Sequence, residues 1–103
     1  MKYTKEQVDK FNKMFSVRKE YTCYAHVNLT EEGIHEEDTQ ENEYNTDAAT
    51  ITLSNGNIYE VHFGTSNDAE GLAIEAFNEL VRLNYDEEEF EKYLQGKSGF
   101  SPS

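Results

Sequence analysis

The sequence of residues 48–63 is AATITLSNGNIYEVHF, and we expect this stretch to decide the fold. Residues 48–54 and 58–63 both alternate between larger apolar and polar side chains, which is the pattern of strands with one buried face. The SNGN sequence between them is typical of a tight turn. The stretch therefore predicts two antiparallel strands joined as a hairpin.

Side-chain parity decides the length of the hairpin loop. A two-residue loop, Asn55-Gly56, would place the larger residues of the two strands on opposite faces. A three-residue loop, residues 55–57, places them on one face, so we expect this loop, with Asn57 near the left-handed region that asparagine tolerates. The expected cross-strand pairs are Leu53–Tyr59, Ile51–Val61 and Ala49–Phe63.

Three segments have the 3.6-residue periodicity of helices with one apolar face: residues 3–16, 67–83 and 86–95. Each has a candidate N-cap that is followed three residues later by Gln or Glu, the capping-box pattern. The candidate N-caps are Thr4, Asn67 and Asp86. We expect Asn84 to end the second helix and Gly96 to end the third.

Residues 20–29 also alternate, which adds a third strand before the hairpin. The expected element order is therefore α-β-β-β-α-α. One face of a three-stranded antiparallel sheet would pack on the helices, giving a two-layer α+β fold. The length of 103 residues suits a single domain, which we expect to span residues 1–96, with residues 97–103 as a flexible C-terminal tail.

The chain is strongly acidic: 21 Asp and Glu residues stand against nine Lys and Arg residues, and the formal net charge is -12. Such a surface repels nucleic acid and anionic membranes. It attracts basic clefts, for which electrostatic steering raises association rates by about 10- to 1,000-fold. We therefore expect neither direct nucleic-acid binding nor membrane binding. Most basic residues lie before residue 20, so the acidic surface is expected on the hairpins and the C-terminal helices.

No apolar stretch follows Met1 or approaches the length of a membrane span, so we expect neither a signal peptide nor a membrane helix. Cys23 is the single cysteine, which excludes an intramolecular disulfide. These features favour a soluble protein of a reducing cytoplasm.

Residues 30–47 carry eight carboxylates and neither Lys nor Arg. With few large apolar residues, this segment buries too little surface to order itself tightly, so we expect a long, partly mobile loop. Two interpretations stay open. The segment is either a solvated loop or a charged arm resembling a phosphate backbone, in which Glu36, Glu37 and Asp38 would contact a partner.

No motif in the sequence supports catalysis or a cofactor. The three histidines are scattered and no CxxC, HxxxH or HExxH pattern is present, which argues against a metal site. Neither a GxSxG nucleophile motif nor a glycine-rich phosphate loop occurs. We therefore expect a non-enzymatic protein with no catalytic residue, no metal and no cofactor.

The sequence of residues 85–90 is YDEEEF, which places four successive carboxylates at the start of the last helix. Acidic residues there interact favourably with the helix macrodipole, at about 0.3–1 kcal/mol each. Four in succession exceed what capping needs. Carboxylates form bidentate pairs with arginine, so this acidic start suits a cleft whose arginines normally bind guanines or phosphates.

In element order, acidity and C-terminal half, the chain resembles the small phage-encoded anti-CRISPR proteins that mimic PAM DNA. These proteins block the single-chain, RNA-guided nuclease of type II-A systems. The resemblance runs from the SNGNIY sequence of residues 54–59 to the YDEEEF sequence of residues 85–90. It implies a non-catalytic inhibitor in the cytoplasm of a host bacterial cell, whose acidic residues occupy the PAM-binding site of the nuclease.

The resemblance also implies which residues contact the nuclease. Asp86 and Glu87 would meet the PAM-reading arginines. The hairpin would make a second contact, although the family carries acidic residues there where this chain has Asn55 and Ile58. The expected contact residues of the helix start and the hairpin are Tyr85, Asp86, Glu87, Glu88, Asn55 and Asn57.

The favoured prediction is therefore an acidic inhibitor whose partner is the basic DNA-binding cleft of a bacterial nuclease, with a CRISPR effector as the favoured target. Three alternatives stay open. One is an anti-restriction protein or another DNA mimic that inhibits a different nucleic-acid enzyme. Another is an acidic adaptor without mimicry, whose binding, unlike that of a mimic, would survive competition by DNA. The third is an acidic metalloenzyme, which would show metal-dependent thermal shifts and turnover.

Overall fold

The computed structural model describes residues 2–20, 24–39, 48–61, 69–97 and 99–102. In these residues the chain forms three helices and six strands. The helices are α1 (Lys5–Met14), α2 (Ala69–Arg82) and α3 (Glu87–Gly96). The strands are β1 (Phe15–Glu20), β2 (Tyr24–Thr30), β3 (Gly33–Thr39), β4 (Ala48–Thr52), β5 (Ile58–Val61) and β6 (Phe100–Pro102).

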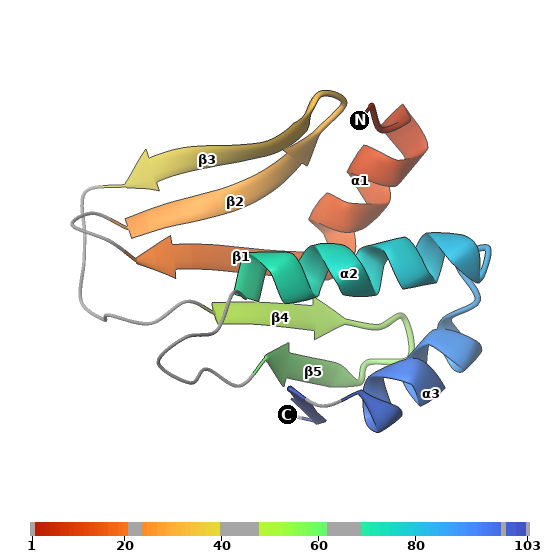
Figure 1. Cartoon of the computed structure of the whole chain (residues 1–103). Coiled ribbons are helices and arrows are strands. Elements are labelled where there is room, and N and C mark those ends of the chain that lie inside the picture. Colours follow the sequence, from red (N-terminus) through yellow and green to blue (C-terminus); the bar gives the residue numbers. More distant parts are fainter. Residues whose placement is uncertain (1, 21–23, 40–47, 62–68, 98, 103) are drawn as a thin grey trace.

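The strands form one antiparallel sheet in the order β3-β2-β1-β4-β5-β6. The helices lie on one face of this sheet, with α2 over β1 and β4, α1 beside β2, and α3 beside β6 (Figure 1). The expected α+β fold is therefore confirmed. The expected three-stranded sheet and the order α-β-β-β-α-α are wrong, because β1, β3 and β6 are additional strands.

β1 follows α1 without a loop and lies at the centre of the sheet, between β2 and β4. The sequence pattern predicts a helix to residue 16, but the helix ends at Met14 and Phe15 has extended backbone angles, φ −108° and ψ 131°. Phe15 and Val17 are buried and Ser16 is exposed, which is the alternation of a strand. Sequence reasoning missed this strand because Phe15 also fits the apolar stripe of the helix.

The β4–β5 hairpin has the expected faces but not the expected register. Ile51 lies opposite Tyr59, whereas the sequence pattern pairs Tyr59 with Leu53. The Leu53 N–H donates to the Asn57 carbonyl at 2.9 Å, so the loop has three residues as expected but begins one residue earlier. Gly56 rather than Asn57 takes the positive φ, 92°, because glycine has no Cβ to clash there. A shift by two residues keeps every side chain on its face.

The acidic segment 30–47 is not a long loop where the structure describes it. Residues 33–39 form β3, which pairs with β2 over its whole length, from Thr30 opposite Gly33 to Tyr24 opposite Thr39. Main-chain hydrogen bonds to β2 form this strand, and Ile34 near its start packs against the core.

Residues 100–102 of the tail are likewise part of the sheet. Residues 97–103 are expected as a flexible extension, but Phe100 lies opposite Val61 and Pro102 opposite Tyr59, so β6 covers the edge of β5. The half-buried side chain of Phe100 packs against the core, which holds this short strand in place. The glycine and serine residues around it gave no periodic signal.

Some expectations fall outside the described residues. These are the N-cap at Asn67, the pairing of Phe63, and the remainder of the acidic segment at residues 40–47. Of the expected capping boxes, the one at Thr4 is present, with both of its hydrogen bonds to Gln7 at 2.9 and 3.1 Å. The box at Asp86 is not: the Asp86 N–H donates to the Leu83 carbonyl at 3.1 Å, and the Glu89 side chain pairs with Lys92 instead.

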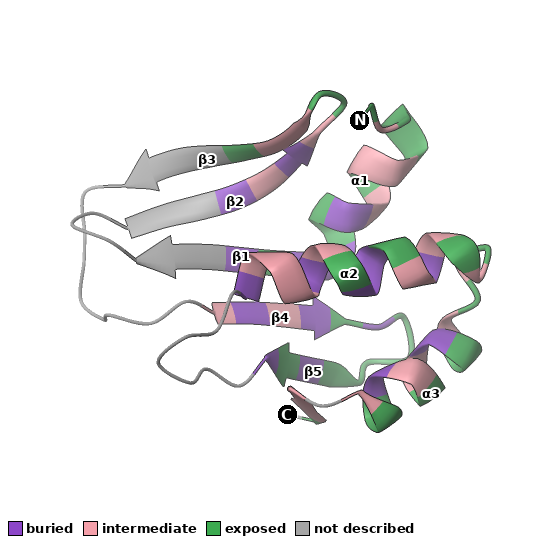
Figure 2. Cartoon of the chain, in the orientation of Figure 1, coloured by how far each residue is buried: buried purple, intermediate pink, exposed green. Residues whose placement is uncertain are grey.

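The core lies between the sheet and the helices (Figure 2). It contains four phenylalanines, Phe11, Phe15, Phe77 and Phe90. The rings of Phe11 and Phe15 stack with centroids 4.8 Å apart, and Phe77 meets both edge-on at 5.3 and 5.7 Å. Phe90 reaches Phe15 at 6.4 Å. The four rings thereby join α1, β1, α2 and α3.

We expect the variant Phe77→Ala to lose about 3–5 kcal/mol of unfolding free energy, because it removes a ring that contacts two others in a fully buried position. That is a large share of the about 5–15 kcal/mol that stabilises a typical domain. Urea unfolding followed by circular dichroism measures the change. The matched control is Ile58→Thr on the exposed face of β5, which should stay within about 0.5 kcal/mol of wild type. A loss of similar size in both variants would contradict this description of the core.

Candidate functional site

The chain turns sharply between α2 and α3. The N–H of Asn84 donates to the Val81 carbonyl at 3.0 Å, and the N–H of Tyr85 donates to the Leu80 carbonyl at 2.9 Å, which is the pattern of a Schellman motif. Asn84 and Tyr85 have positive φ angles of 54° and 60°. Asn84 therefore ends α2 as expected, and Tyr85 is held in a conformation that is uncommon for a bulky residue.

α3 begins at the acidic turn, which we define as residues 86–89. Asp86 is the N-cap: its Oδ1 accepts the backbone N–H groups of Glu88 at 3.1 Å and Glu89 at 3.3 Å. The prediction that Asp86 caps this helix is confirmed. The cap satisfies backbone donors that would otherwise lack partners, so it fixes where the turn starts.

Glu87 is bound within the fold. Its carboxylate accepts the backbone N–H and the hydroxyl of Ser54, both at 2.7 Å, and lies 3.5 Å from the Lys10 ammonium group. Partial burial raises the pKa of Glu87, but the two hydrogen bonds from Ser54 and the charge of Lys10 outweigh it, so the pKa is lowered. The carboxylate is therefore held ionised between the hairpin and α1.

Glu91, one helical turn after Glu87, is a second link to the hairpin. Its carboxylate accepts hydrogen bonds from the side-chain amides of Asn55 at 3.0 Å and Asn57 at 2.7 Å, and from the Tyr59 hydroxyl at 2.8 Å. The bonds from Asn57, Tyr59 and Asn55 lower the pKa of Glu91 against a smaller opposing effect of burial. Sequence reasoning missed this residue. Its spacing of four from Glu87, on the same helix face, was the available signal.

We call this arrangement the hairpin clamp. It consists of Glu87 and Glu91 on α3 together with Ser54, Asn55, Asn57 and Tyr59 of the hairpin. Within the hairpin, the Asn57 N–H also donates to the Asn55 side-chain oxygen at 2.9 Å. The clamp thus brings together the two elements that sequence reasoning selected, the hairpin loop and the acidic start of the last helix.

The remaining acidic side chains of the turn are exposed. Glu89 pairs with Lys92 on its own helix at 3.2 Å. Glu88 makes no side-chain hydrogen bond to the described residues, and Asp86 uses Oδ1 alone for its cap. In contrast to Glu87, the carboxylates of Asp86 and Glu88 are therefore accessible to a partner.

The other predicted contact residues lie elsewhere. Glu36, Glu37 and Asp38 belong to β3, opposite Val27, His26 and Ala25 of β2. β3 is one edge of the sheet, whereas α3 packs beside β6 at the other edge. The structure therefore separates these three residues from the acidic turn.

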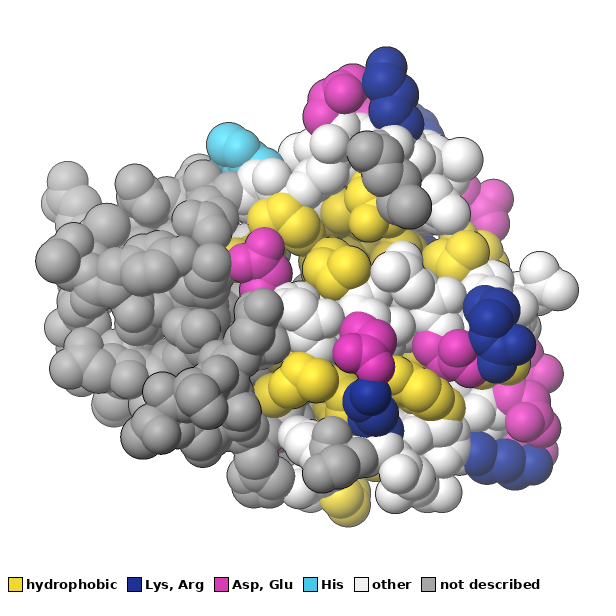
Figure 3. Space-filling model, viewed as in Figure 1, with side chains coloured by type: hydrophobic (Ala, Val, Ile, Leu, Met, Phe, Trp, Pro, Cys, Tyr) yellow, Lys and Arg dark blue, Asp and Glu magenta, His cyan; other side chains and the backbone are white. Residues whose placement is uncertain are grey.

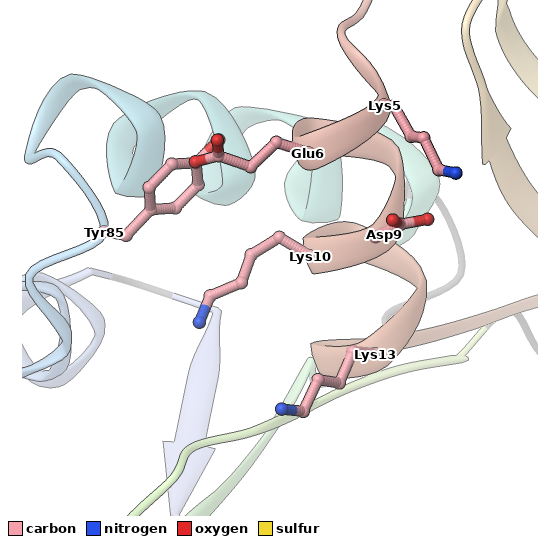
Figure 4. A pocket seen from close by; sticks show the side chains of 6 residues that line it. All are labelled: Lys5, Glu6, Asp9, Lys10, Lys13 and Tyr85. Atoms are coloured by element: carbon pink, nitrogen blue, oxygen red, sulfur yellow. The ribbon is translucent and has the colours of Figure 1, made fainter.

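An open hollow of about 550 Å³ lies between α1 and the start of α3 (Figure 4). Tyr85 forms one wall, and the Lys10 ammonium group lies 5.9 Å from the centre of its ring. Burial and the nearby Glu6 carboxylate raise the pKa of Tyr85. The residues that line the hollow are Lys5, Glu6, Asp9, Lys10, Lys13 and Tyr85. Since both signs of charge occur here, the hollow does not select a ligand by charge alone.

Basic residues near the C-terminus are paired with carboxylates. The ion pairs are Arg82–Glu79, Lys92–Glu89 and Lys97–Glu75. Figure 3 accordingly shows Lys and Arg side chains next to Asp and Glu on the described surface. Exposed pairs of this kind contribute little stability, and they leave the excess of negative charge to the unpaired acids.

Among the described residues, no group of three or more His, Cys, Asp and Glu side chains is arranged to hold a metal ion. None of the described helices is long and apolar enough to cross a membrane.

Comparison of the chain with protein-family models, with curated proteins and with solved structures finds no match.

We expect the clamp to stabilise the fold above acidic pH and to lose this effect as pH falls. Glu87 and Glu91 have lowered pKa values in the folded state. Their contribution is therefore fully present above the unfolded value of about 4.3 and disappears as pH falls through the lowered folded values. The unfolding free energy of wild type and of Glu87→Gln/Glu91→Gln, measured from neutral pH downward, should converge in the acidic range. A gap that widens on acidification would contradict the assignment.

Proposed function

We propose that this protein is a non-catalytic inhibitor that occupies the DNA-binding cleft of a bacterial nuclease, with the PAM-reading site of an RNA-guided CRISPR nuclease as the target. The observation that supports this most is the hairpin clamp. It fixes an acidic turn against a hairpin loop, on a chain whose net charge is -12.

The charge favours a basic cleft as the partner. At physiological ionic strength the Debye length is about 8 Å, so the excess charge guides the approach while the exposed acids of the turn act at contact. A basic cleft attracts this surface for the same reason that it attracts DNA. The protein can therefore compete with DNA for such a cleft without resembling the shape of DNA anywhere except at the acidic turn.

The chemistry of the turn suits arginine. An arginine that reads guanine in the major groove donates two N–H groups to the O6 and N7 acceptors. A carboxylate offers two oxygen acceptors that match the same fork of donors. The exposed Glu88 can offer both of its oxygens in this way, and the exposed Asp86 can offer Oδ2, because its Oδ1 caps α3. Glu87 is already bound by Ser54 and lies beside Lys10, so we assign it to the support of the turn instead of to direct contact.

Capture of partners from a bacterial lysate tests the proposal, at low and moderate salt and with or without excess duplex DNA. An inhibitor of the proposed kind should capture a nucleic-acid enzyme that duplex DNA displaces, and should then block cleavage by it. A restriction enzyme in place of a CRISPR nuclease would keep the mimicry and change the target. Capture that is indifferent to DNA would refute mimicry in favour of an adaptor.

With the target identified, we expect Asp86→Asn/Glu88→Gln to bind it at least about tenfold more weakly, a change of about 1.4 kcal/mol. Asparagine caps helices as well as aspartate does, so this variant removes two charges and keeps the start of α3. The control, Glu31→Gln/Glu32→Gln, removes two charges at the β2–β3 turn. Equal weakening by both variants would show that net charge, and not the turn, determines binding.

A further inference from the structure

We propose that Glu91 is a positioning residue for partner binding, which fixes the hairpin loop so that loop and acidic turn meet the partner as one surface. This inference rests on the proposed function. It reverses the expected role of Asn55 and Asn57, whose side-chain amides donate to Glu91 and so support the site from within.

The geometry of α3 separates positioning from contact. Glu87 and Glu91 are four residues apart and lie on one helix face, where four side-chain donors and one backbone N–H of the hairpin reach them. Glu88 lies on another face and has no side-chain hydrogen bond to the described residues. Glutamates of one short helix therefore have two roles: Glu87 and Glu91 hold the hairpin, and Glu88 is available to contact the partner.

The bonds of Glu91 span a large distance in sequence. The three hairpin residues that donate to its carboxylate lie 32, 34 and 36 residues away in the sequence. Tyr59 is buried and also accepts a bond from Gln95 at 3.2 Å, which anchors this side of the network. Charge-assisted hydrogen bonds are the stronger kind, so Glu91 is well placed to hold the loop.

The loop itself needs such support. Gly56 has φ 92°, and no atom lies within 4 Å of the place a Cβ would take, so the glycine at the tip has no packing contact there and the loop is held by its hydrogen bonds to α3. A free hairpin tip would have to be ordered on binding, at about 0.5–1.5 kcal/mol for each immobilised side chain. Fixing it beforehand lowers that loss, and the gain is expected in the dissociation rate.

Kinetic binding measurements on the captured target separate the two roles. Glu91→Gln should raise the dissociation rate by about tenfold and leave the salt dependence of the association rate equal to that of the control Glu31→Gln. Glu88→Gln should instead lower the association rate and weaken its salt dependence. Asn55→Ala/Asn57→Ala removes no charge and should reproduce the effect of Glu91→Gln.

Two further measurements make the test decisive. Combining Glu91→Gln with Asn55→Ala/Asn57→Ala should cost clearly less than the sum of the two effects, because both variants disrupt the bonds from Asn55 and Asn57 to Glu91. Amide exchange at residues 54–57 of the free protein should speed up in Glu91→Gln while the sheet stays protected, which separates loop release from unfolding.

The outcomes against the inference are distinct from those against the proposed function. Additive effects in the combined variant, or a dissociation rate unchanged in Glu91→Gln, would overturn the positioning role while wild type still binds. A salt dependence altered as in Glu88→Gln would make Glu91 a direct contact. Failure of the wild-type protein to bind any partner that DNA displaces would overturn the proposed function, and the positioning role with it.

Discussion

The contact between Phe15 and its three aromatic neighbours is the interaction on which the rest of the structure depends. Phe15 stands at the junction of α1 and β1, stacks on Phe11, and is met by Phe77 from α2 and Phe90 from α3. It thereby sets how far α3 lies from the central strand. The hydrogen bonds of the clamp act over less than 3.1 Å, so they form only because this packing has already brought α3 to the hairpin.

The carboxylates of this chain differ in their accessibility to a partner because their surroundings differ, and not because of their residue type. Glu87 and Glu91 receive several hydrogen bonds and behave as parts of the fold, whereas Glu88 faces solvent from the same helix. A domain with so much excess charge repels itself, and such internal bonds offset part of that repulsion locally. Counting acids therefore says little about how many of them a partner can reach.

The sequence predicted those features that repeat along the chain. Helix periodicity located the three helices, and alternation placed the faces of β4 and β5 correctly. The capping-box pattern marked the start of α1 at Thr4, and the N-cap at Asp86 marked the start of α3. Parity cannot detect a register shift of two residues, so the Ile51–Tyr59 pair was not foreseen. β3 depends on main-chain bonds to β2, and β6 on the single anchor Phe100, so neither leaves a periodic pattern. Of the clamp, the loop and the helix start were predictable, while the bonds of Glu91 depend on tertiary packing.

The two edges of the sheet have a consequence for self-association. β3 is one edge, and two copies of it aligned antiparallel would place the Glu36-Glu37-Asp38 sequences close to each other, where like charges repel. The other edge, β6, has three residues and ends at Pro102, which lacks an N–H to donate to a further strand. Both edges therefore discourage the strand-to-strand stacking that leads to aggregation, and at β3 it is the acidity of the strand that keeps copies of the sheet apart.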